Sequence, residues 1–293
     1  MNNQKLAIDI GYGWTKFYDG KTLKKIPSIF TRKSGNYFDD SSVISHDNDY
    51  IVGKPASIFP FSSLSYEDVS DIIKYAPLFV KYAIKTTKST PDTIISGLPP
   101  GFKSKFPEFK SVLQQFANNV IIVPQSVGIL SYVLEKNMSL IDKKILTIDI
   151  GFNTLDYIIN YYNKEKKEWV FESYDTFVNF GTSKCLETFR STCPMEIVGQ
   201  YTINELQEIF ENGYIGNPKI DLSEYKKNAI ELYSEHVINT IKNVISKKIF
   251  NIIDVIIIGG GGANIIDTSK FDKEIIIPEQ PDFAQVIGYY SLI

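Results

Sequence analysis

The stretch Ile8-Asp9-Ile10-Gly11-Tyr12 recurs further along the chain as Ile148-Asp149-Ile150-Gly151-Phe152. In each copy a short aliphatic run ends in an acid and a glycine, a pattern that predicts a buried strand stopping in a tight turn. A carboxylate at the end of such a strand is costly unless it has a partner. Two such turns facing one another therefore predict a clamp for a metal–phosphate group.

The elements around each copy also repeat. Each acidic turn joins the two strands of a predicted hairpin. The strands are expected at 5–10 and 14–18 in the first copy, and at 144–150 and 154–162 in the second. Further strands are expected at 23–29, 93–96, 120–123, 169–174 and 252–258. Helices are expected at 66–87 with a break at Pro77, at 127–136, at 202–211, at 224–249 behind a capping box at Asp221, and after a cap at Asp282. This order implies a duplicated α/β protein with a ligand crevice between its halves.

Composition narrows the class of protein. The chain has 293 residues, enough for about two domains, and 43% of them are hydrophobic, so a large core is expected. A net charge of −3 argues against direct nucleic-acid binding, which needs a basic surface. Two cysteines form no disulfide framework, and no signal or membrane segment is visible, so we expect a cytoplasmic protein that makes no membrane contact.

Candidate site residues cluster at the repeated turns. Asp9 and Asp149 suit magnesium, which takes one or two carboxylates besides water and phosphate oxygens. Either acid alone would more often cap its own turn by accepting backbone amides, but the recurrence with the same flanking residues favours the metal role. Gly11 and Gly13 would let backbone amides approach a phosphate, and Lys16 follows at a spacing that suits the same phosphate.

Other candidates come from the second copy and from two later segments. Gly151 would supply a free amide, with Asn153 and Thr154 as side-chain donors. Four glycines at 259–262 end a strand, where backbone could pack flat against a ligand. Gln125 follows a strand and opens a helix, a position from which a glutamine can orient an attacking water.

These residues resemble the five ordered segments of the actin, sugar-kinase and chaperone ATPase superfamily. The two phosphate segments resemble 7–16 and 146–156, and the adenosine segment resembles 256–263. The two connecting segments resemble 124–128 and 283–290. Within the superfamily the chain is most similar to actin-like plasmid-segregation proteins of the ParM, StbA and AlfA kind.

The resemblance implies an actin-like, ribonuclease H-like α/β fold of two duplicated domains with a nucleotide in the cleft between them. Domain I would comprise residues 1–148 and 283–293, with a small subdomain at about 31–65. Domain II would comprise residues 149–282, with a small subdomain at about 190–222.

The resemblance also implies roles for single residues. Asp149 and Gln125 would be catalytic, and Asp149 would hold Mg²⁺ through water with Asp9 near the hydration shell. Tyr12 and Phe152 are bulky where relatives carry small residues, so their side chains should point away from the phosphates. ATP or ADP would be bound by Gly11, Tyr12, Gly13, Trp14, Lys16, Gly151, Asn153, Thr154, Gly181, Thr182, Gly260, Gly261, Gly262 and Ala263.

The expected function is that of an ATPase, with GTP as the alternative nucleotide. It would polymerise into filaments, hydrolyse slowly as they assemble, and move plasmid DNA through an adaptor protein. One alternative is a sugar or small-acid kinase of the same superfamily, with Asp156 as its base. Another is an FtsA- or PilM-like scaffold, which would need a membrane-binding terminal helix that neither end of the sequence offers.

Overall fold

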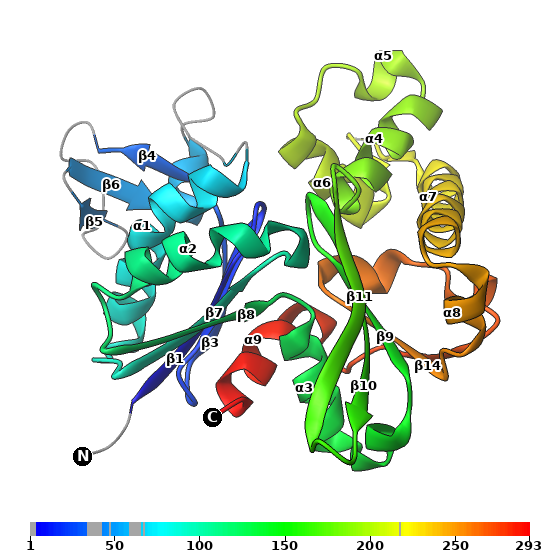
Figure 1. Ribbon diagram of the computed structural model, residues 1–293. Coiled ribbons are helices and arrows are strands. Elements are labelled where there is room, and N and C mark those ends of the chain that lie inside the picture. The colour runs from blue at the N-terminus through cyan, green and yellow to red at the C-terminus, as the bar shows by residue number, and fades with distance from the viewer. Residues whose placement is uncertain (1–3, 34–42, 47, 59–65, 67, 217) are drawn as a thin grey trace.

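The computed structural model describes residues 4–33, 43–46, 48–58, 66, 68–216 and 218–293. Two five-stranded sheets form its framework, in the orders β3-β2-β1-β7-β8 and β11-β10-β9-β14-β15. The two halves stand side by side, and helices α3 and α9 lie between them at the base of the molecule (Figure 1).

The first sheet combines an antiparallel meander with two parallel strands. β1 pairs antiparallel with β2 and parallel with β7, and the outer strands β3 and β8 continue these directions. The strands are β1 (Lys5–Ile10), β2 (Trp14–Tyr18), β3 (Leu23–Pro27), β7 (Thr93–Leu98) and β8 (Asn119–Pro124).

The second sheet follows the same plan. β9 pairs antiparallel with β10 and parallel with β14, while β11 and β15 extend the sheet at its edges. The strands are β9 (Ile145–Ile150), β10 (Thr154–Asn163), β11 (Glu168–Val178), β14 (Val255–Gly259) and β15 (Glu274–Ile276). The shared plan confirms the duplicated two-domain α/β fold, and the acids of the repeat end the equivalent strands β1 and β9.

Helices cover the sheets, and each half has a separate apolar core. The α-helices are α1 (Val69–Thr87), α2 (Phe106–Leu113), α3 (Val127–Lys136), α4 (Thr182–Thr192), α5 (Met195–Val198), α6 (Ile203–Asn212), α7 (Ser223–Val244), α8 (Lys247–Asn251) and α9 (Pro281–Ser291). The 3₁₀ helices are η2 (Lys54–Ile58), η3 (Pro100–Lys105), η4 (Met138–Asp142), η5 (Gly261–Ile265) and η6 (Thr268–Lys270). Cys185 and Cys193 are buried and free.

Two small sheets lie outside this framework. β4 (Phe30–Arg32), β5 (Val43–His46) and β6 (Asn48–Val52) form a three-stranded sheet in the expected subdomain at 31–65, part of which lies outside the described residues. β12 (Tyr214–Ile215) pairs with β13 (Ile220–Asp221) in the expected subdomain at 190–222. The domain boundaries themselves stay a prediction.

Gln285 of α9 fixes the start of α3. Its Oε1 accepts hydrogen bonds from the backbone N–H groups of Ser126 (3.1 Å) and Ile129 (3.3 Å). Ser126 has a φ of 75° and its own side chain does not cap the helix, so Gln285 satisfies amides that would otherwise stay unpaired. Gln125, the residue before Ser126, is thereby held at a fixed position between the halves.

One predicted break is absent. Pro77 lies inside α1, which continues through it from the Asp68 N-cap to a left-handed Lys88. Proline in a helix interior costs about 3 kcal/mol. Here the helix buries apolar side chains both before and after the proline, such as Ile73 and Phe79, and this burial outweighs the local cost.

The predicted helix at 224–249 is present but ends early, and two predicted caps are wrong. α7 ends at Val244 because Ser246 caps a separate helix, α8. Asp221 accepts a hydrogen bond from the Ser223 amide but forms no capping box with Glu224. The described structure places a capping box at the start of α6, where Thr202 and Glu205 form it.

Asp282 does not cap α9 either. It lies in the first turn of this helix, and its carboxylate binds Lys25 of β3.

Candidate functional site

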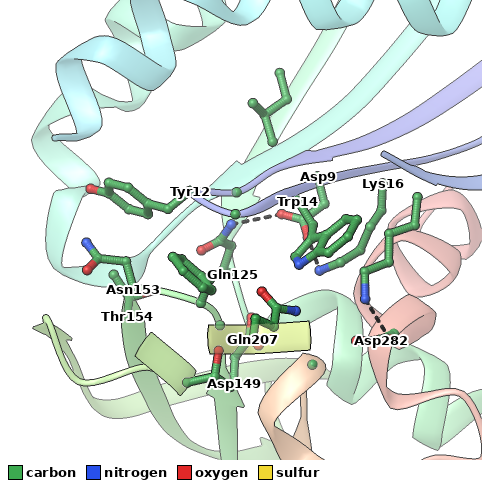
Figure 2. A pocket seen from close by; sticks show the side chains of 18 of the residues that line it. Asp9, Tyr12, Trp14, Lys16, Gln125, Asp149, Asn153, Thr154, Gln207 and Asp282 are labelled. Atoms are coloured by element: carbon green, nitrogen blue, oxygen red, sulfur yellow. Dashed lines mark hydrogen bonds and ion pairs between the residues drawn. The ribbon is translucent and has the colours of Figure 1, made fainter. Parts of the chain in front are cut away.

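A cavity of about 340 Å³ opens between the two halves. This volume falls within the range of small-molecule sites. The turns after β1 and β9 both contribute to its wall, together with α6 and the glycine-rich segment after β14 (Figure 2). The cavity therefore lies where the repeated acids of the two strands converge.

The structure brings most of the predicted site residues to this cavity. Those lining it are Asp9, Gly11, Tyr12, Gly13, Trp14, Lys16, Gln125, Asp149, Gly151, Asn153, Thr154, Thr182 and Gly261. Gly181, Gly260, Gly262 and Ala263 do not line it. The nucleotide, catalytic and metal roles of all these residues stay predictions.

The three glycines outside the lining, Gly181, Gly260 and Gly262, pack closely against residues of the wall. A side chain at Gly181 would meet the backbone of Phe152, and one at Gly262 would meet Ile150 and Thr182. These glycines allow backbone segments to pack closely behind the wall.

The two repeated turns close in the same way. The N–H of Gly11 donates to the carbonyl of Trp14 (3.1 Å), and the N–H of Gly151 donates to the carbonyl of Thr154 (2.9 Å). The free amide predicted at Gly151 is therefore wrong, because this amide completes its own turn.

The turns also touch each other across the cavity. A Cβ added to Gly13 would lie 2.7 Å from Cγ of Phe152, so a larger residue at position 13 would push the halves apart. Tyr12 and Phe152 both line the cavity, whereas we expected their side chains to point away from a bound phosphate. Where they lie relative to a phosphate stays a prediction.

Asp9 is the centre of a small polar network. Its Oδ2 accepts from the Lys16 ammonium (3.1 Å) and its Oδ1 from the Gln125 amide (2.9 Å), as the dashed lines in Figure 2 show. Burial alone would lower the pKa of Lys16, but Asp9 and Asp149 outweigh burial and raise it. Lys16 is therefore a permanent cation at the cavity wall.

Asp149 has a different environment from its counterpart. Asp149 is buried, with 8% of its surface exposed, and it lines the cavity. Within the described residues, no hydrogen bond or ion pair engages its carboxylate. Burial raises the pKa of Asp149 to about 7, Lys16 opposes this shift, and Asp9 adds to it. A carboxylate of this kind gains most from a cation in the cavity.

The cross-strand partner of Asp149 is a second acid. Asp156 lies opposite it on β10, where the first sheet places Lys16 opposite Asp9. Asp156 accepts hydrogen bonds from the hydroxyls of Thr154 (3.1 Å) and Thr176 (2.6 Å). Burial and the charge of Asp149 raise the pKa of Asp156 well above its usual range.

Replacing Asp149 with asparagine is expected to stabilise the nucleotide-free protein at pH 8 but not at pH 4. Burial raises the pKa of Asp149 in the folded protein to about 7, above its unfolded value of 3.8. The wild-type protein therefore has its full stability below pH 3.8 and loses stability as the pH rises through 7, because the buried carboxyl group ionises. The asparagine variant lacks this loss. Thermal unfolding in EDTA should show a Tm gain over wild type that grows with pH, and an equal gain at both pH values would contradict the assignment.

Several residues of the cavity were missed by the sequence reasoning. Leu186, Gln207, Phe210, Glu211, Asn264 and Ile265 form the wall on the second half, and Lys25 and Asp282 close it near α9. The Gln207 amide donates to the Glu211 carboxylate one turn further along α6 (2.9 Å). No local motif marks these residues, because helix packing alone brings α4 and α6 to the cavity.

The carboxylates fit a metal ion that is held mainly by other ligands. Among the described residues, no group of three or more His, Cys, Asp and Glu side chains could hold a metal ion by itself. Asp149 is unpaired and Asp9 lies near it, which suits a hydrated Mg²⁺ that also binds phosphate oxygens. Asp9 already accepts two hydrogen bonds, so Asp149 is the better candidate to orient metal-bound water.

Within the described parts of the chain, no helix combines the length and apolar character that a membrane crossing requires.

Comparisons with known proteins agree with this geometry. A model of the N-terminal domain of actin-like proteins matches residues 7–128, and a model of the C-terminal part of archaeal MreB-like actin homologues matches residues 147–270. No curated protein sequence matches the chain.

Similar solved structures extend over the whole chain. The ADP complex of the archaeal actin homologue Ta0583 is 21% identical, with a TM-score of 0.80 over 98% of both chains. A non-polymerisable quadruple mutant of pCBH ParM is 22% identical, with a TM-score of 0.77 over 99% of this chain and 98% of that one. MamK in its double helical filament is 16% identical, with a TM-score of 0.72 over 99% of this chain and 98% of the MamK chain. With its two family matches, its actin-like fold and its interdomain cavity, the chain belongs to the actin-like ATPase superfamily.

Proposed function

We propose that the chain binds ATP with Mg²⁺ in the interdomain cavity and uses the nucleotide to control its assembly into filaments. The observation that carries this proposal is the pair of facing turns, with the Lys16 cation on one side and the unpaired Asp149 carboxylate on the other. A cation and a free acid on opposite walls suit a magnesium–polyphosphate group.

The residues divide the chemistry between the two halves. Lys16 neutralises phosphate charge from the first half, and the side chain of Asn153 donates from the second, where Thr154 also lines the cavity. Magnesium supplies charge neutralisation for the phosphate oxygens and polarises its bound waters when present. Asp149 would orient water at this position, and Gln125, whose amide donates to Asp9, would position the attacking water through its Oε1.

The proposals for assembly and cargo draw on the similar solved structures. A ParM structure among the neighbours is described as a non-polymerisable mutant, and MamK is described in a double helical filament. The chain is proposed to polymerise in the same manner, in the cytoplasm, with ATP favouring the assembled state and hydrolysis favouring release. Segregation of plasmid DNA through an adaptor protein is the proposed role, supported by the similarity to ParM.

One structural observation disfavours the kinase alternative. Its proposed base, Asp156, is 1% exposed, accepts hydrogen bonds from two threonines and does not line the cavity. A base must reach the hydroxyl that it deprotonates, and Asp156 has no route to an acceptor sugar.

Pelleting and negative-stain microscopy test the proposed function. With Mg²⁺, ATP or a slowly hydrolysed analogue should give sedimentable filaments, whereas ADP and nucleotide-free samples should stay in the supernatant. Absence of assembly with every nucleotide over a wide range of protein concentration would refute filament formation. ATP turnover only in the presence of a sugar would instead support the kinase reading.

A further inference from the structure

Three charged residues form a row across the first sheet where it meets the cavity. Asp9 of β1 lies opposite Lys16 of β2, and Lys16 lies opposite Lys25 of β3. Cross-strand partners share a face of the sheet, and like charges placed directly opposite destabilise it. The adjacent lysines therefore carry a cost that the packing of the sheet does not explain.

The two lysines differ in how they are neutralised. Lys16 is fixed by the buried carboxylate of Asp9 at 3.1 Å. Lys25 is about a quarter exposed, lies 4.6 Å from the centre of the Trp14 ring, and pairs with Asp282 at 2.9 Å. Both residues line the cavity, and they are the only cations among the described residues that do.

Asp282 is an incomplete partner for Lys25. Its Oδ2 accepts from the lysine, but its Oδ1 is buried and has no hydrogen-bond partner among the described groups. A buried acceptor without a partner is costly. The Asp282 side chain comes from the first turn of α9, next to Gly261 of the glycine-rich segment, and both Asp282 and Lys25 line the cavity.

We propose that Lys25 is a second phosphate-binding lysine of the cavity, and that Asp282 holds its ammonium until a nucleotide arrives. An anion above the row would relieve the repulsion between Lys16 and Lys25, and a polyphosphate carries more charge than the single carboxylate of Asp282. The ring of Trp14 lies beside the Lys25 ammonium as a further partner. This inference rests on the proposed function, because it assigns a ligand within the same nucleotide site.

Calorimetric titration of MgATP, MgADP and adenosine into matched variants tests the assignment. Lys25→Met should weaken the binding of both nucleotides by roughly ten- to a hundredfold. This is the loss of affinity expected when a hydrogen bond to a charged group is removed. Adenosine has no phosphate, and its affinity should not change. Lys24→Met is the control, because it removes the same charge from the neighbouring exposed position on β3.

Asp282→Asn separates the two parts of the inference. It removes the anion that competes with phosphate, so it should tighten MgATP binding several-fold. A loss as large as that of Lys25→Met would show that Asp282 is itself a nucleotide ligand and would overturn its role as a placeholder.

Further outcomes would overturn the role of Lys25. If Lys25→Met bound MgATP with wild-type affinity, Lys25 would not be a phosphate ligand. The same conclusion would follow if the variant lost as much affinity for adenosine as for MgATP. Lys25→Arg keeps the charge and should retain MgATP binding within a few-fold, which decides the matter if the methionine variant unfolds. If wild-type protein binds no nucleotide while remaining folded, the proposed function itself fails and this assignment fails with it.

Discussion

Replacing Asp149 with alanine is expected to abolish phosphate release from ATP while leaving the fold intact. Its carboxylate lines the cavity, and no other described residue pairs with it, so its removal breaks no internal hydrogen bond. A group that activates or orients the attacking water contributes about 10²- to 10⁴-fold to the rate. A phosphate-release assay under MgATP saturation should therefore show a loss of at least about a hundredfold.

A matched control separates this effect from general damage. Asp142 is an exposed acid outside the cavity, where it pairs with Lys164. Asp142→Ala should turn over ATP like the wild type. Wild-type turnover in Asp149→Ala, with circular dichroism showing a native fold, would remove Asp149 from the catalytic role.

Replacing Gly288 with leucine is expected to destabilise the whole protein. Gly288 of α9 lies against the backbone carbonyl of Gly128 in α3, and a Cβ at either glycine would overlap the backbone of the other helix. Backbone atoms cannot move aside as a side chain can, so the helices must separate. The free energy of unfolding should fall by about 3 kcal/mol or more, the upper end for overpacking.

The same substitution should also impair the site. α9 packs on both sheets and holds the start of α3 through Gln285, so separating the helices moves Gln125 relative to Asp9. Thermal unfolding gives the stability, with Ser291→Leu as the control, since it places the same leucine at an exposed position of α9. Equal melting temperatures for the two variants would contradict the close helix crossing.

The repeated acidic turns were predictable because their signal is local. An aliphatic strand, an acid and a glycine occur within a few residues, and both copies end equivalent strands in the structure. Sequence reasoning likewise placed α3 at its observed bounds, because its apolar positions recur with a helical period.

The remaining features depend on contacts between distant segments. The cavity wall from α4 and α6, and the Lys25–Asp282 ion pair, join residues that no sequence spacing relates. The helix through Pro77 was missed for a similar reason, since burial on both sides of the proline overrides its local preference.

The duplication is one of fold and not of chemistry. Lys16 lies opposite Asp9, whereas Asp156 lies opposite Asp149 at the equivalent place. The first half thus presents cations to the cavity, and the second presents the unpaired acid Asp149, whose cross-strand partner is another buried acid. This asymmetry suits a ligand that carries phosphate on one side and a metal ion on the other.

The most direct test of nucleotide binding in the cleft is calorimetric titration of ATP into the purified wild-type protein, with Mg²⁺ and with EDTA. One ATP should bind per chain with Mg²⁺, ADP should compete for the same site, and EDTA should weaken the binding of ATP. A folded protein that binds neither nucleotide at millimolar concentration would contradict a nucleotide site between Lys16 and Asp149.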